Sequence, residues 1–456
     1  MMIKNGRDAA MQALLQMEEN EGYSNIVLDK TLRAARLDSR ESSLASILFY
    51  GVLEKRVVLE WALAPFCRRP LDQLDLPVRT ALFSAAYQIL FLDKIPDSAA
   101  VNDAVEWIKT YGYGKAAGFV NGTLRNFLRG KEALSFPAET DSSLLALSLR
   151  SGIPQELLAF WQKAYGVPAA VRFAAVLGKK APRFGRVNET KLSVDEFCRR
   201  AAEAGFSARP VEEIPGCVQL TGLGSVGENP LYQQGLFTIQ DASSQLCVLF
   251  SGVKPGDRVA DVCAAPGGKS FSAGIRMQNC GEICSFDLYR GKVRQIREGA
   301  GRLGLSLIRA EVRDAAGDQT LQDRFDVVFC DVPCSGYGII RRKPEIRYKT
   351  LRSVRQLPSL QARILDRSAA LVKPGGTMMI STCTLVPDEN EESVRRFLQR
   401  HPEFSPVPLP DVSGVAPVVP EPDWCRTLMP ENAFGGDGFF VAKLQRSREE
   451  GKKEEE

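Results

Sequence analysis

Apolar residues in the first 130 positions recur at the three-to-four-residue spacing of one helix face. The clearest stripes are Ala100, Val101, Ala104, Val105 and Ile108; Leu82, Ala85, Ala86, Ile89 and Leu90; and Ala117, Val120, Leu124 and Leu128. Asp97-Ser98 offers a cap before the first stripe, and Leu76-Pro77 predicts the start of the helix that carries the second. We predict a helical bundle here, because such faces need only pack against one another.

The stretch from 130 to 142 breaks the helical pattern and is predicted to be a linker. Beyond it the pattern of 154–165 is helical. Residues 184–187 and 217–220 are predicted strands, with a helix over 194–204 between them. This order of elements predicts a small α+β region.

From residue 240 the pattern becomes strand, loop and helix in alternation. Short apolar runs lie at 258–262, 282–286, 307–310, 325–330 and 377–380. This alternation predicts a parallel, doubly wound sheet with helices on both faces. A Pro-rich, irregular stretch over 402–431 precedes a last predicted strand at 439–443, and the terminal EEGKKEEE is typical of a solvated, disordered tail.

Composition and charge narrow the class of protein. The 456 residues are too many for one ordinary domain, and 44% hydrophobic with 25% charged residues excludes global disorder. The net charge of +4 permits a nucleic-acid partner without requiring one. We expect no membrane span and no signal peptide, because the chain lacks the long apolar window that a span needs and its first fifteen residues lack a signal-peptide core.

Cysteine and histidine usage limits the chemistry. Eleven cysteines lie scattered without metal-type CxxC pairs, which predicts reduced thiols in a cytoplasm. His401 is the only histidine, so histidine triads, histidine general bases and histidine-rich zinc sites are excluded. Any catalysis must therefore use Cys, Asp, Glu, Lys or Tyr.

A small-residue loop follows the first strand of the predicted parallel sheet. Its members are Cys263, Ala264, Ala265, Pro266, Gly267, Gly268 and Lys269. Two glycines beside a helix N-terminus let the backbone approach a ligand, although neither the dinucleotide nor the phosphate-loop spacing is present. Asp287 ends the second strand, where acidic residues accept hydrogen bonds from ribose, and Asp314 follows the third, where it could meet adenine. Each aspartate alone fits a helix cap equally well, but three successive strand ends together favour a nucleoside site.

Two cysteines stand at the ends of neighbouring predicted strands. Cys334 follows Asp331 in a Pro-containing loop, and Cys383 is flanked by threonines. Both are expected at the carboxyl edge of the sheet, facing one crevice. Other cysteines are interpreted as small buried hydrophobes: Cys247, Cys280, Cys284 and Cys330.

Four motifs in order make the chain resemble the bacterial RNA 5-methylcytosine methyltransferases. They are DVCAAPGGK (261–269), DVPCSG (331–336), IRRKPEIRY (340–348) and STCT (381–384), supported by QDASSQ (240–245) and DGFF (437–440). Ile95-Pro96 and FVNGTLR (119–125) resemble the NusB-type antitermination domain. That fusion is the arrangement of small-subunit ribosomal RNA cytosine-5 methyltransferases of the RsmB/Sun type. The chain departs in KPEIRY, where a tryptophan is commoner, and in having no histidine before DGFF.

The resemblance implies roles for individual residues. Cys383 would be the nucleophile that adds to carbon 6 of cytosine, and Cys334 would assist release by removing the carbon-5 proton. Asp331 would bind the N3 and exocyclic amine edge. Lys269 would support the electrostatics of the site and a depressed pKa at Cys383, although a solvated lysine at a helix start is an equal alternative. S-adenosylmethionine would bind the 263–269 loop together with Asp287, Asp314 and Asp331.

The resemblance also implies the architecture and the partner. We expect an all-α NusB-like domain (1–132), a small α+β linking domain (140–235), a Rossmann-like α/β class I methyltransferase domain (236–446) and a disordered tail (447–456). The expected substrate is a specific cytosine of 16S ribosomal RNA, unassembled or partly assembled. The expected enzyme is a cytoplasmic monomer that makes no membrane contact.

A basic run follows the Cys334 loop. It consists of Arg341, Arg342, Lys343, Arg347, Lys349, Arg352 and Arg355, interleaved with Tyr337 and Tyr348. Alone it fits a solvated face, but beside an active-site loop it favours phosphate contacts and base stacking. Two alternatives stay open: the same chemistry on transfer RNA, and a non-catalytic antitermination-type RNA-binding regulator.

Overall fold

The computed structural model describes residues 3–20, 24–317 and 322–448. Contacts divide the chain into two compact units. The first, which we call the helical unit, is Met1–Gly178 together with Arg342–Lys349, and the second, the sheet unit, is Lys179–Arg341 together with Thr350–Glu456. No helix in the described part of the chain is both long and apolar enough to span a bilayer.

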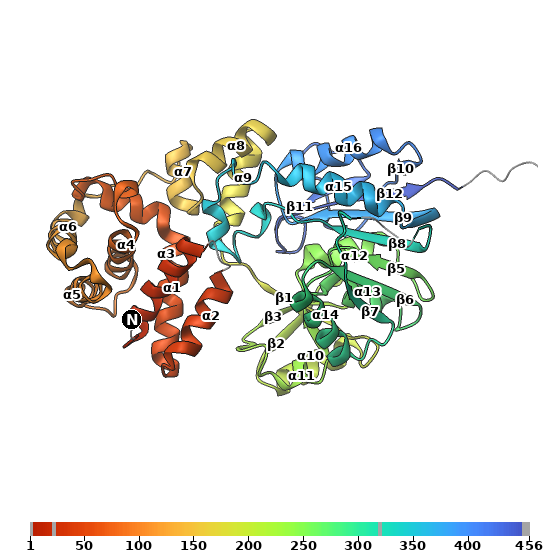
Figure 1. Cartoon of the computed structure of the whole chain (residues 1–456), viewed down its shortest axis with the longest axis horizontal. Coiled ribbons are helices and arrows are strands. Elements are labelled where there is room, and N and C mark those ends of the chain that lie inside the picture. Colours follow the sequence, from red (N-terminus) through yellow and green to blue (C-terminus); the bar gives the residue numbers. More distant parts are fainter. Residues whose placement is uncertain (1–2, 21–23, 318–321, 449–456) are drawn as a thin grey trace, which may run out of the picture. The chain divides into compact units, whose positions relative to one another are not determined.

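The helical unit is a bundle, coloured red to yellow in Figure 1. Its helices are α1 (Gly6–Asn20), α2 (Ser24–Ala35), α3 (Ser39–Leu63), α4 (Leu76–Phe91), α5 (Asp97–Ile108), α6 (Ala117–Gly130), α7 (Leu144–Ser151), α8 (Gln155–Tyr165) and α9 (Val167–Leu177). The helices α1 to α6 bury one core, which includes Phe49, Leu82, Trp107 and Phe127. This confirms the predicted helical bundle and its apolar stripes. The cap predicted at Asp97-Ser98 is wrong, because Pro96 precedes the first turn and no side chain caps it.

Residues 342–349 form a strap that belongs to the helical unit although they are remote from it in sequence. The strap contains the short helix η7 (Pro344–Tyr348). Arg347 Nη1 donates to the carbonyl oxygens of Glu54, Ser151 and Gly152 at 3.2–3.4 Å. The Tyr348 hydroxyl donates to the Leu53 carbonyl at 2.8 Å. The strap therefore adds hydrogen bonds to carbonyls in the middle of α3 and at the C-terminal end of α7.

The first part of the sheet unit is the small α+β region. Its elements are β1 (Arg183–Val187), α10 (Val194–Glu203), β2 (Ser207–Pro210), β3 (Cys217–Thr221), α11 (Pro230–Gln233) and β4 (Phe237–Ile239). The strands form an antiparallel sheet of order β2-β3-β1-β4. Phe197, Phe206 and Phe237 pack together in its core. The region matches the predicted α+β class.

An eight-stranded sheet forms the rest of the sheet unit, in the order β10-β12-β9-β8-β5-β6-β7, with β11 paired to β12. The strands are β5 (Arg258–Asp261), β6 (Glu282–Asp287), β7 (Ile308–Val312), β8 (Phe325–Asp331), β9 (Val372–Thr382), β10 (Phe404–Pro406), β11 (Cys425–Leu428) and β12 (Phe439–Arg446). The strands β5 to β9 are parallel, and β12 joins β9 antiparallel. The five predicted parallel strands and the predicted last strand are thus confirmed.

Helices cover both faces of this sheet, as predicted. They are α12 (Ala242–Ser251), α13 (Gly268–Arg276), α14 (Arg290–Leu303), α15 (Leu357–Ala369) and α16 (Glu391–Arg400). The helices α12, α13 and α14 share one apolar core with the sheet, and α15 and α16 share the other (Figure 1). The stretch 402–431, predicted as irregular, in fact contributes β10 and β11, which pair with β12. Most of the predicted tail, 449–456, lies outside the described residues.

Candidate active site and cofactor site

The candidate site lies at the carboxyl ends of the parallel strands. Strand β5 lies between β6 and β8, so the chain leaves it toward β6 on one side, while β8 and β9 extend the sheet on the other. Ligands of open α/β sheets bind at such a switch point. The loops that follow β5, β6, β8 and β9 carry nearly all of the predicted site residues.

The predicted small-residue loop lies between β5 and α13. Gly267 has φ of 109°, which an L side chain rarely adopts, and a Cβ there would collide with the Phe271 ring. Gly268 begins α13, so the free N–H groups of its first turn lie beside the loop. A cavity of about 180 Å³ is lined by Ala264, Ala265, Pro266, Gly268 and Lys269 of this loop, together with Ile239, Gln240, Asp241, Ser244, Asp261 and Asp331.

Two buried oxygens in this cavity lack partners. Asp261 Oδ2 accepts from the Ser270 hydroxyl at 2.7 Å, but within the described residues Asp261 Oδ1 and Gln240 Oε1 accept no hydrogen bond. Burial raises the pKa of Asp261 to about 7, although Ser270 and Lys269 act in the opposite direction. A cationic ligand with N–H donors, such as the amino end of S-adenosylmethionine, fits this arrangement because it would satisfy both oxygens.

Asp287 and Asp314 differ in their surroundings. Asp287 is buried at the end of β6, where its carboxylate accepts from the backbone N–H of Ala265 at 3.3 Å and of Tyr289 at 3.2 Å. It therefore lies against the glycine loop, and its contact with ribose stays a prediction. Asp314 lies beyond β7, and its Oδ1 accepts from Ala316 N at 2.9 Å. Asp314 does not line the cavity.

Lys269 and Asp331 form a close ion pair inside the site. Lys269 Nζ lies 2.6 Å from Asp331 Oδ2, and the Ser381 hydroxyl donates to Asp331 Oδ1 at 2.9 Å. Lys269 is 5% exposed, which rules out the alternative of a solvated lysine. Burial acts to lower its pKa, but the Asp331 carboxylate together with Cys247 and Asp261 outweighs burial, and the pKa of Lys269 lies above its ordinary value. Lys269 is thus a fixed cation that holds Asp331 in place.

The thiols of Cys334 and Cys383 are in direct contact. Their Sγ atoms lie 3.1 Å apart, and the backbone N–H of Cys383 points to Cys334 Sγ at 3.3 Å. The hydrogen bond with Cys383 raises the pKa of Cys334, as do burial and the carboxylates of Glu389 and Asp331. Cys334 therefore retains its proton and can share it with the Cys383 sulfur. The parallel pairing of β8 with β9 produces this meeting, since Asp331 is in register with Ser381.

Glu389 is a site residue that the sequence reasoning missed. It lies on the short helix η8 (Pro387–Glu389) and is 2% exposed. Its Oε2 accepts from Ser335 N and from Gln361 Nε2, both at 2.9 Å. The only signal was its place in the motif PDEN (387–390), shortly after the second cysteine.

Residues of the motifs QDASSQ and DGFF hydrogen-bond to each other and to the segment that follows Cys334. Asp241 Oδ1 accepts from Asp437 N at 2.9 Å, and Arg341 pairs with the Asp437 carboxylate at 3.2 Å. Gly338 N donates to the Cys383 carbonyl at 2.9 Å and Gly438 N to the Gly338 carbonyl at 3.0 Å. Gln240 and Asp241 also line the cofactor cavity, which the sequence reasoning missed.

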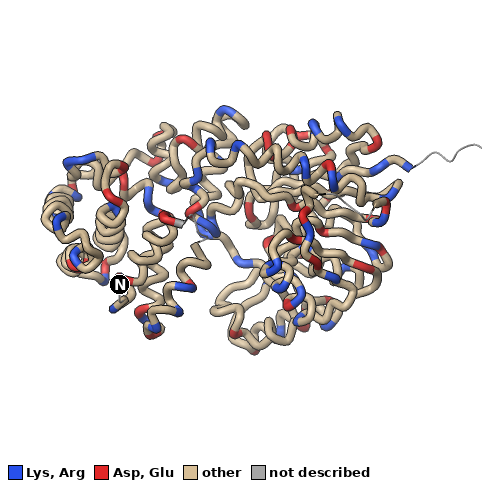
Figure 2. The backbone as a smooth tube through the Cα atoms, in the orientation of Figure 1, with Lys and Arg blue, Asp and Glu red and all other residues tan. Residues whose placement is uncertain are grey.

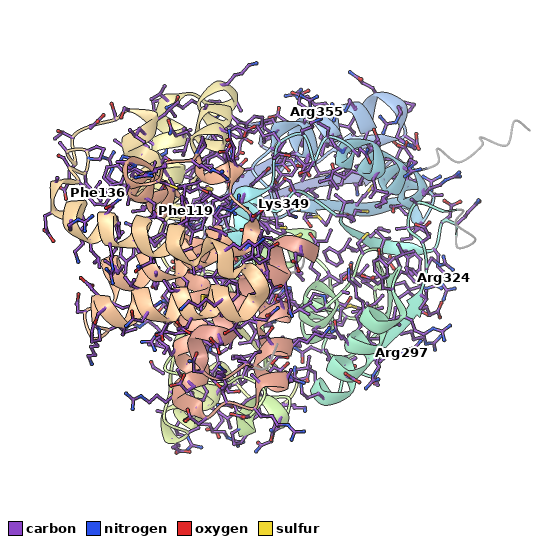
Figure 3. All side chains as sticks on the ribbon, turned by 60° about the vertical axis from the view of Figure 1, so that its left-hand side comes forward. Phe119, Phe136, Arg297, Arg324, Lys349 and Arg355 are labelled. Atoms are coloured by element: carbon purple, nitrogen blue, oxygen red, sulfur yellow. The ribbon has the colours of Figure 1, made fainter. Side chains whose placement is uncertain are left out.

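The predicted basic surface is wrong in part. Arg341 donates to the carbonyls of Gly435 and Gly436 and is buried, as is Arg347 in the strap. Tyr337 is 0% exposed, so it cannot stack on a base. Lys349, Arg352 and Arg355 are exposed and remain predicted RNA contacts; Lys349 and Arg355 are labelled in Figure 3.

Of the four cysteines predicted to be buried, three are buried and one is exposed. Cys247, Cys284 and Cys330 are buried in the cores of the sheet unit. Cys280 is exposed, because it stands in the tight turn between α13 and β6 where its side chain has no core to enter. All eleven cysteines are free thiols.

A doubly wound sheet, a glycine loop at its switch point and a cavity suited to a cationic amino end define a class of enzyme, the S-adenosylmethionine-dependent methyltransferases. Comparisons with known proteins agree. The family described as 16S rRNA methyltransferase RsmB/F matches residues 249–445, the NusB family matches 4–129, and the RsmF/B-like ferredoxin-like domain matches 153–227.

Relatives match almost the whole chain. The probable ribosomal RNA small subunit methyltransferase B of Bacillus subtilis is 36% identical over 96% of this chain and 98% of its own. The crystal structure of PH0851 has a TM-score of 0.80 at 24% identity, covering 97% of this chain and 98% of that one. A methyltransferase homolog from Pyrococcus horikoshii has a TM-score of 0.57 at 29% identity, covering 67% and 99%. The chain belongs to the RsmB/F family of S-adenosylmethionine-dependent methyltransferases, which act on small-subunit ribosomal RNA.

Proposed function

We propose that this enzyme methylates carbon 5 of a cytosine in 16S ribosomal RNA through a covalent adduct. The observation that carries the proposal is the thiol pair: Cys334 and Cys383 end adjacent strands with their sulfurs 3.1 Å apart, beside Asp331. Methylation of a ribose oxygen or of an exocyclic nitrogen needs no thiol, whereas carbon 5 becomes nucleophilic only when a thiolate adds to carbon 6.

Cys383 begins the reaction. Its thiolate adds to carbon 6, the carbon 5–carbon 6 double bond opens, and electron density moves onto carbon 5 and toward N3. Asp331, oriented by Lys269 and Ser381, would bind the N3 and amine edge and stabilise the charge that develops there. S-adenosylmethionine would supply the electrophilic methyl group that carbon 5 attacks, and its sulfonium sulfur would keep the electrons of the methyl–sulfur bond that breaks. The base must be flipped out or single-stranded for Cys383 to reach it.

Cys334 completes the reaction. The adduct carries both a methyl group and a hydrogen on carbon 5. Cys334 removes that proton, directly or through water, after its own thiol proton has passed to solvent. The electrons of the carbon–hydrogen bond then re-form the carbon 5–carbon 6 double bond, and the bond from carbon 6 to sulfur breaks to return Cys383 as a thiolate. The negative neighbours of Cys334 favour this role, because a higher pKa makes its thiolate a stronger base.

The residues that would hold S-adenosylmethionine follow from the cavity. Asp261 and Gln240 would accept from its amino group, the 263–269 loop would lie along it, and Asp287 would bind the ribose. Asp287 and Asp314 both lie outside the cavity lining, so their contacts with ribose and adenine stay predictions.

The RNA partner would be held mainly by its phosphates. We infer a cytoplasmic monomer that acts on unassembled or partly assembled 16S ribosomal RNA, with the free thiols suited to a reducing compartment. Transfer RNA is the substrate of the alternative, and bisulfite sequencing of both RNAs from cells lacking the enzyme distinguishes the two.

The test separates the two thiols. Cys383→Ala cannot form the adduct, so turnover should fall to background. Cys334→Ala should attack and methylate but stall, giving a slow-migrating protein–RNA band on a denaturing gel. The wild type and the double variant should give no such band.

Other outcomes would contradict the assignment. A trapped band only in Cys383→Ala would exchange the two roles. Full activity without a band in both variants would show that the thiols are structural and that the chemistry is different. Wild-type protein without transferase activity on any RNA would favour the non-catalytic regulator.

A further inference from the structure

The peptide groups on both sides of Cys334 are held by one buried carboxylate and its partner amide. Glu389 Oε2 accepts from Ser335 N at 2.9 Å, directly after Cys334. Gln361 Nε2 donates both to Glu389 Oε2 and to the Pro333 carbonyl, each at 2.9 Å, directly before Cys334. Hydrogen bonds thus run from Pro333 through Gln361 and Glu389 to Ser335, and the backbone of Cys334 closes the ring.

The same segment that carries Glu389 also fixes the loop of Cys383. Thr384 Oγ1 lies 2.5 Å from Ser335 Oγ. Asn390, the neighbour of Glu389, donates from Nδ2 to the Thr384 carbonyl at 3.0 Å, and its Oδ1 accepts from the Thr382 hydroxyl at 2.6 Å. Two neighbouring residues of the PDEN motif therefore bind different loops: Asn390 binds the Cys383 loop, and Glu389 binds the Cys334 loop.

Burying the Glu389 carboxylate costs desolvation free energy, which indicates that this carboxylate has a role at the site. Burial raises the pKa of Glu389 against the opposing effect of its two donors, and its Oε1 accepts no hydrogen bond from the described residues. The neighbouring carboxylate of Asp388 is 61% exposed and pairs with Arg396 instead. Asp388 therefore serves as a comparison for Glu389: the two acidic residues are adjacent in sequence, but Glu389 is buried beside the site and Asp388 is exposed to solvent.

We propose that Glu389 is a positioning residue for Cys334, required for release of the methylated RNA but not for attack by Cys383. This inference rests on the proposed function, in which Cys334 removes the carbon-5 proton. Without Glu389 the Ser335 N–H loses its acceptor and Gln361 loses one of its two anchors, so the peptide groups beside Cys334 are held less firmly. Cys383 keeps its own anchors in Asn390, Gly338 and β9.

The experiment measures a ratio, trapped protein–RNA complex divided by released methylated RNA, in the full-length enzyme. Glu389→Ala should raise this ratio at least tenfold, as Cys334→Ala should. Glu389→Gln should keep it within about threefold of the wild type, because the amide oxygen still accepts from Ser335 and Gln361. Glu389→Asp, one methylene shorter, should raise it. An unfolded fraction makes neither product, so loss of stability alone does not move the ratio.

Asp388→Asn is the matched control and should leave the ratio unchanged. If Cys334→Ala stalls and Glu389→Ala does not, Glu389 has no positioning role and the inference is wrong. If Glu389→Ala makes neither complex nor product while folded, Glu389 serves attack rather than release, which also overturns it. Where Glu389→Ala does not fold, Glu389→Asp against Glu389→Gln decides. If Cys334→Ala itself fails to stall, the proposed release role falls, and the inference falls with it.

Discussion

At the scale of single residues, burial determines the protonation state of Asp261 in the cofactor site. Asp261 ends β5 with one oxygen bonded to Ser270 and the other unpartnered within the described residues. Burial raises its pKa from 3.8 to about 7. Because the pKa is higher in the folded than in the unfolded chain, Asp261 contributes stability below about pH 4 that is lost as the pH rises through 7.

Binding of S-adenosylmethionine should favour the ionised form of Asp261, whereas burial alone favours the protonated form. A cationic amino group beside Asp261 favours the carboxylate, so binding should release a proton and the affinity should rise between about pH 5.5 and 7. The limit for one proton is about tenfold per pH unit. Calorimetry in two buffers of different ionisation enthalpy measures the proton release. Asp261→Asn should bind more weakly but without pH dependence over this range, and an equal slope in this variant would show that another group titrates.

At the scale of elements, the burial of side chains in short polar segments cannot be read from their charge pattern, whereas apolar periodicity predicts the helices and strands. The basic run after the Cys334 loop illustrates this. Its charge pattern indicates an RNA surface, yet Arg341 and Arg347 direct their guanidinium groups to backbone carbonyls inside the protein. Only Lys349, Arg352 and Arg355 among the predicted phosphate contacts present exposed cations. Basic and acidic residues are intermixed elsewhere along the chain (Figure 2).

Substitutions in this segment should therefore separate into two kinds. Arg352→Ala with Arg355→Ala should weaken RNA binding and lower the salt dependence of log K by roughly 0.7–0.9 for each phosphate that the variant no longer neutralises. Arg347→Ala should leave that slope unchanged but destabilise the fold by about 1–3 kcal/mol, because three carbonyls lose a charged donor. Filter binding across a salt series and thermal unfolding measure the two effects. A reduced salt slope in Arg347→Ala would contradict the separation.

The same contrast explains how far the sequence could predict the fold and the site. Strand ends are visible in the sequence because β5 to β9 are apolar runs that stop at polar residues, and parallel pairing then brings Asp261, Asp287, Asp331 and Cys383 to one edge. Glu389 and Gln240 were not predictable in this way, since each reaches the site through a turn or loop whose path depends on tertiary packing. The burial of Arg341 depends on carbonyls almost a hundred residues away in sequence. No local pattern records such a partner.

At the scale of the whole molecule, we expect a second RNA contact in the helical unit. A pocket of about 540 Å³ in this unit is lined by Arg56, Arg68, Arg69 and Arg79, with Glu60, Ala64, Cys67, Pro70, Leu71 and Asp72. Arg56 and Arg79 both pair with Glu18, which fixes their positions. Arg68 and Arg69 are exposed at its rim. Phosphates are the natural ligand of such guanidinium groups.

Loss of the two rim arginines should weaken binding of 16S ribosomal RNA. Arg68→Ala with Arg69→Ala should lower both the affinity and the slope of log K against log salt. Methylation of a short substrate that spans only the target base should be unaffected. Arg40→Ala, an exposed arginine near the other end of α3, is the control. An equal loss in the control would show that overall charge rather than this pocket is responsible.

The strap has a consequence for how the protein is made. Residues 1–178 are synthesised first, but Arg342–Lys349, which complete the helical unit, follow about 160 residues later. At typical rates of translation that is a delay of roughly ten to thirty seconds. During this interval the carbonyls of Glu54, Ser151 and Gly152 lack the hydrogen bonds that Arg347 donates in the complete chain. The first domain to emerge from the ribosome is therefore finished only after most of the second has been translated.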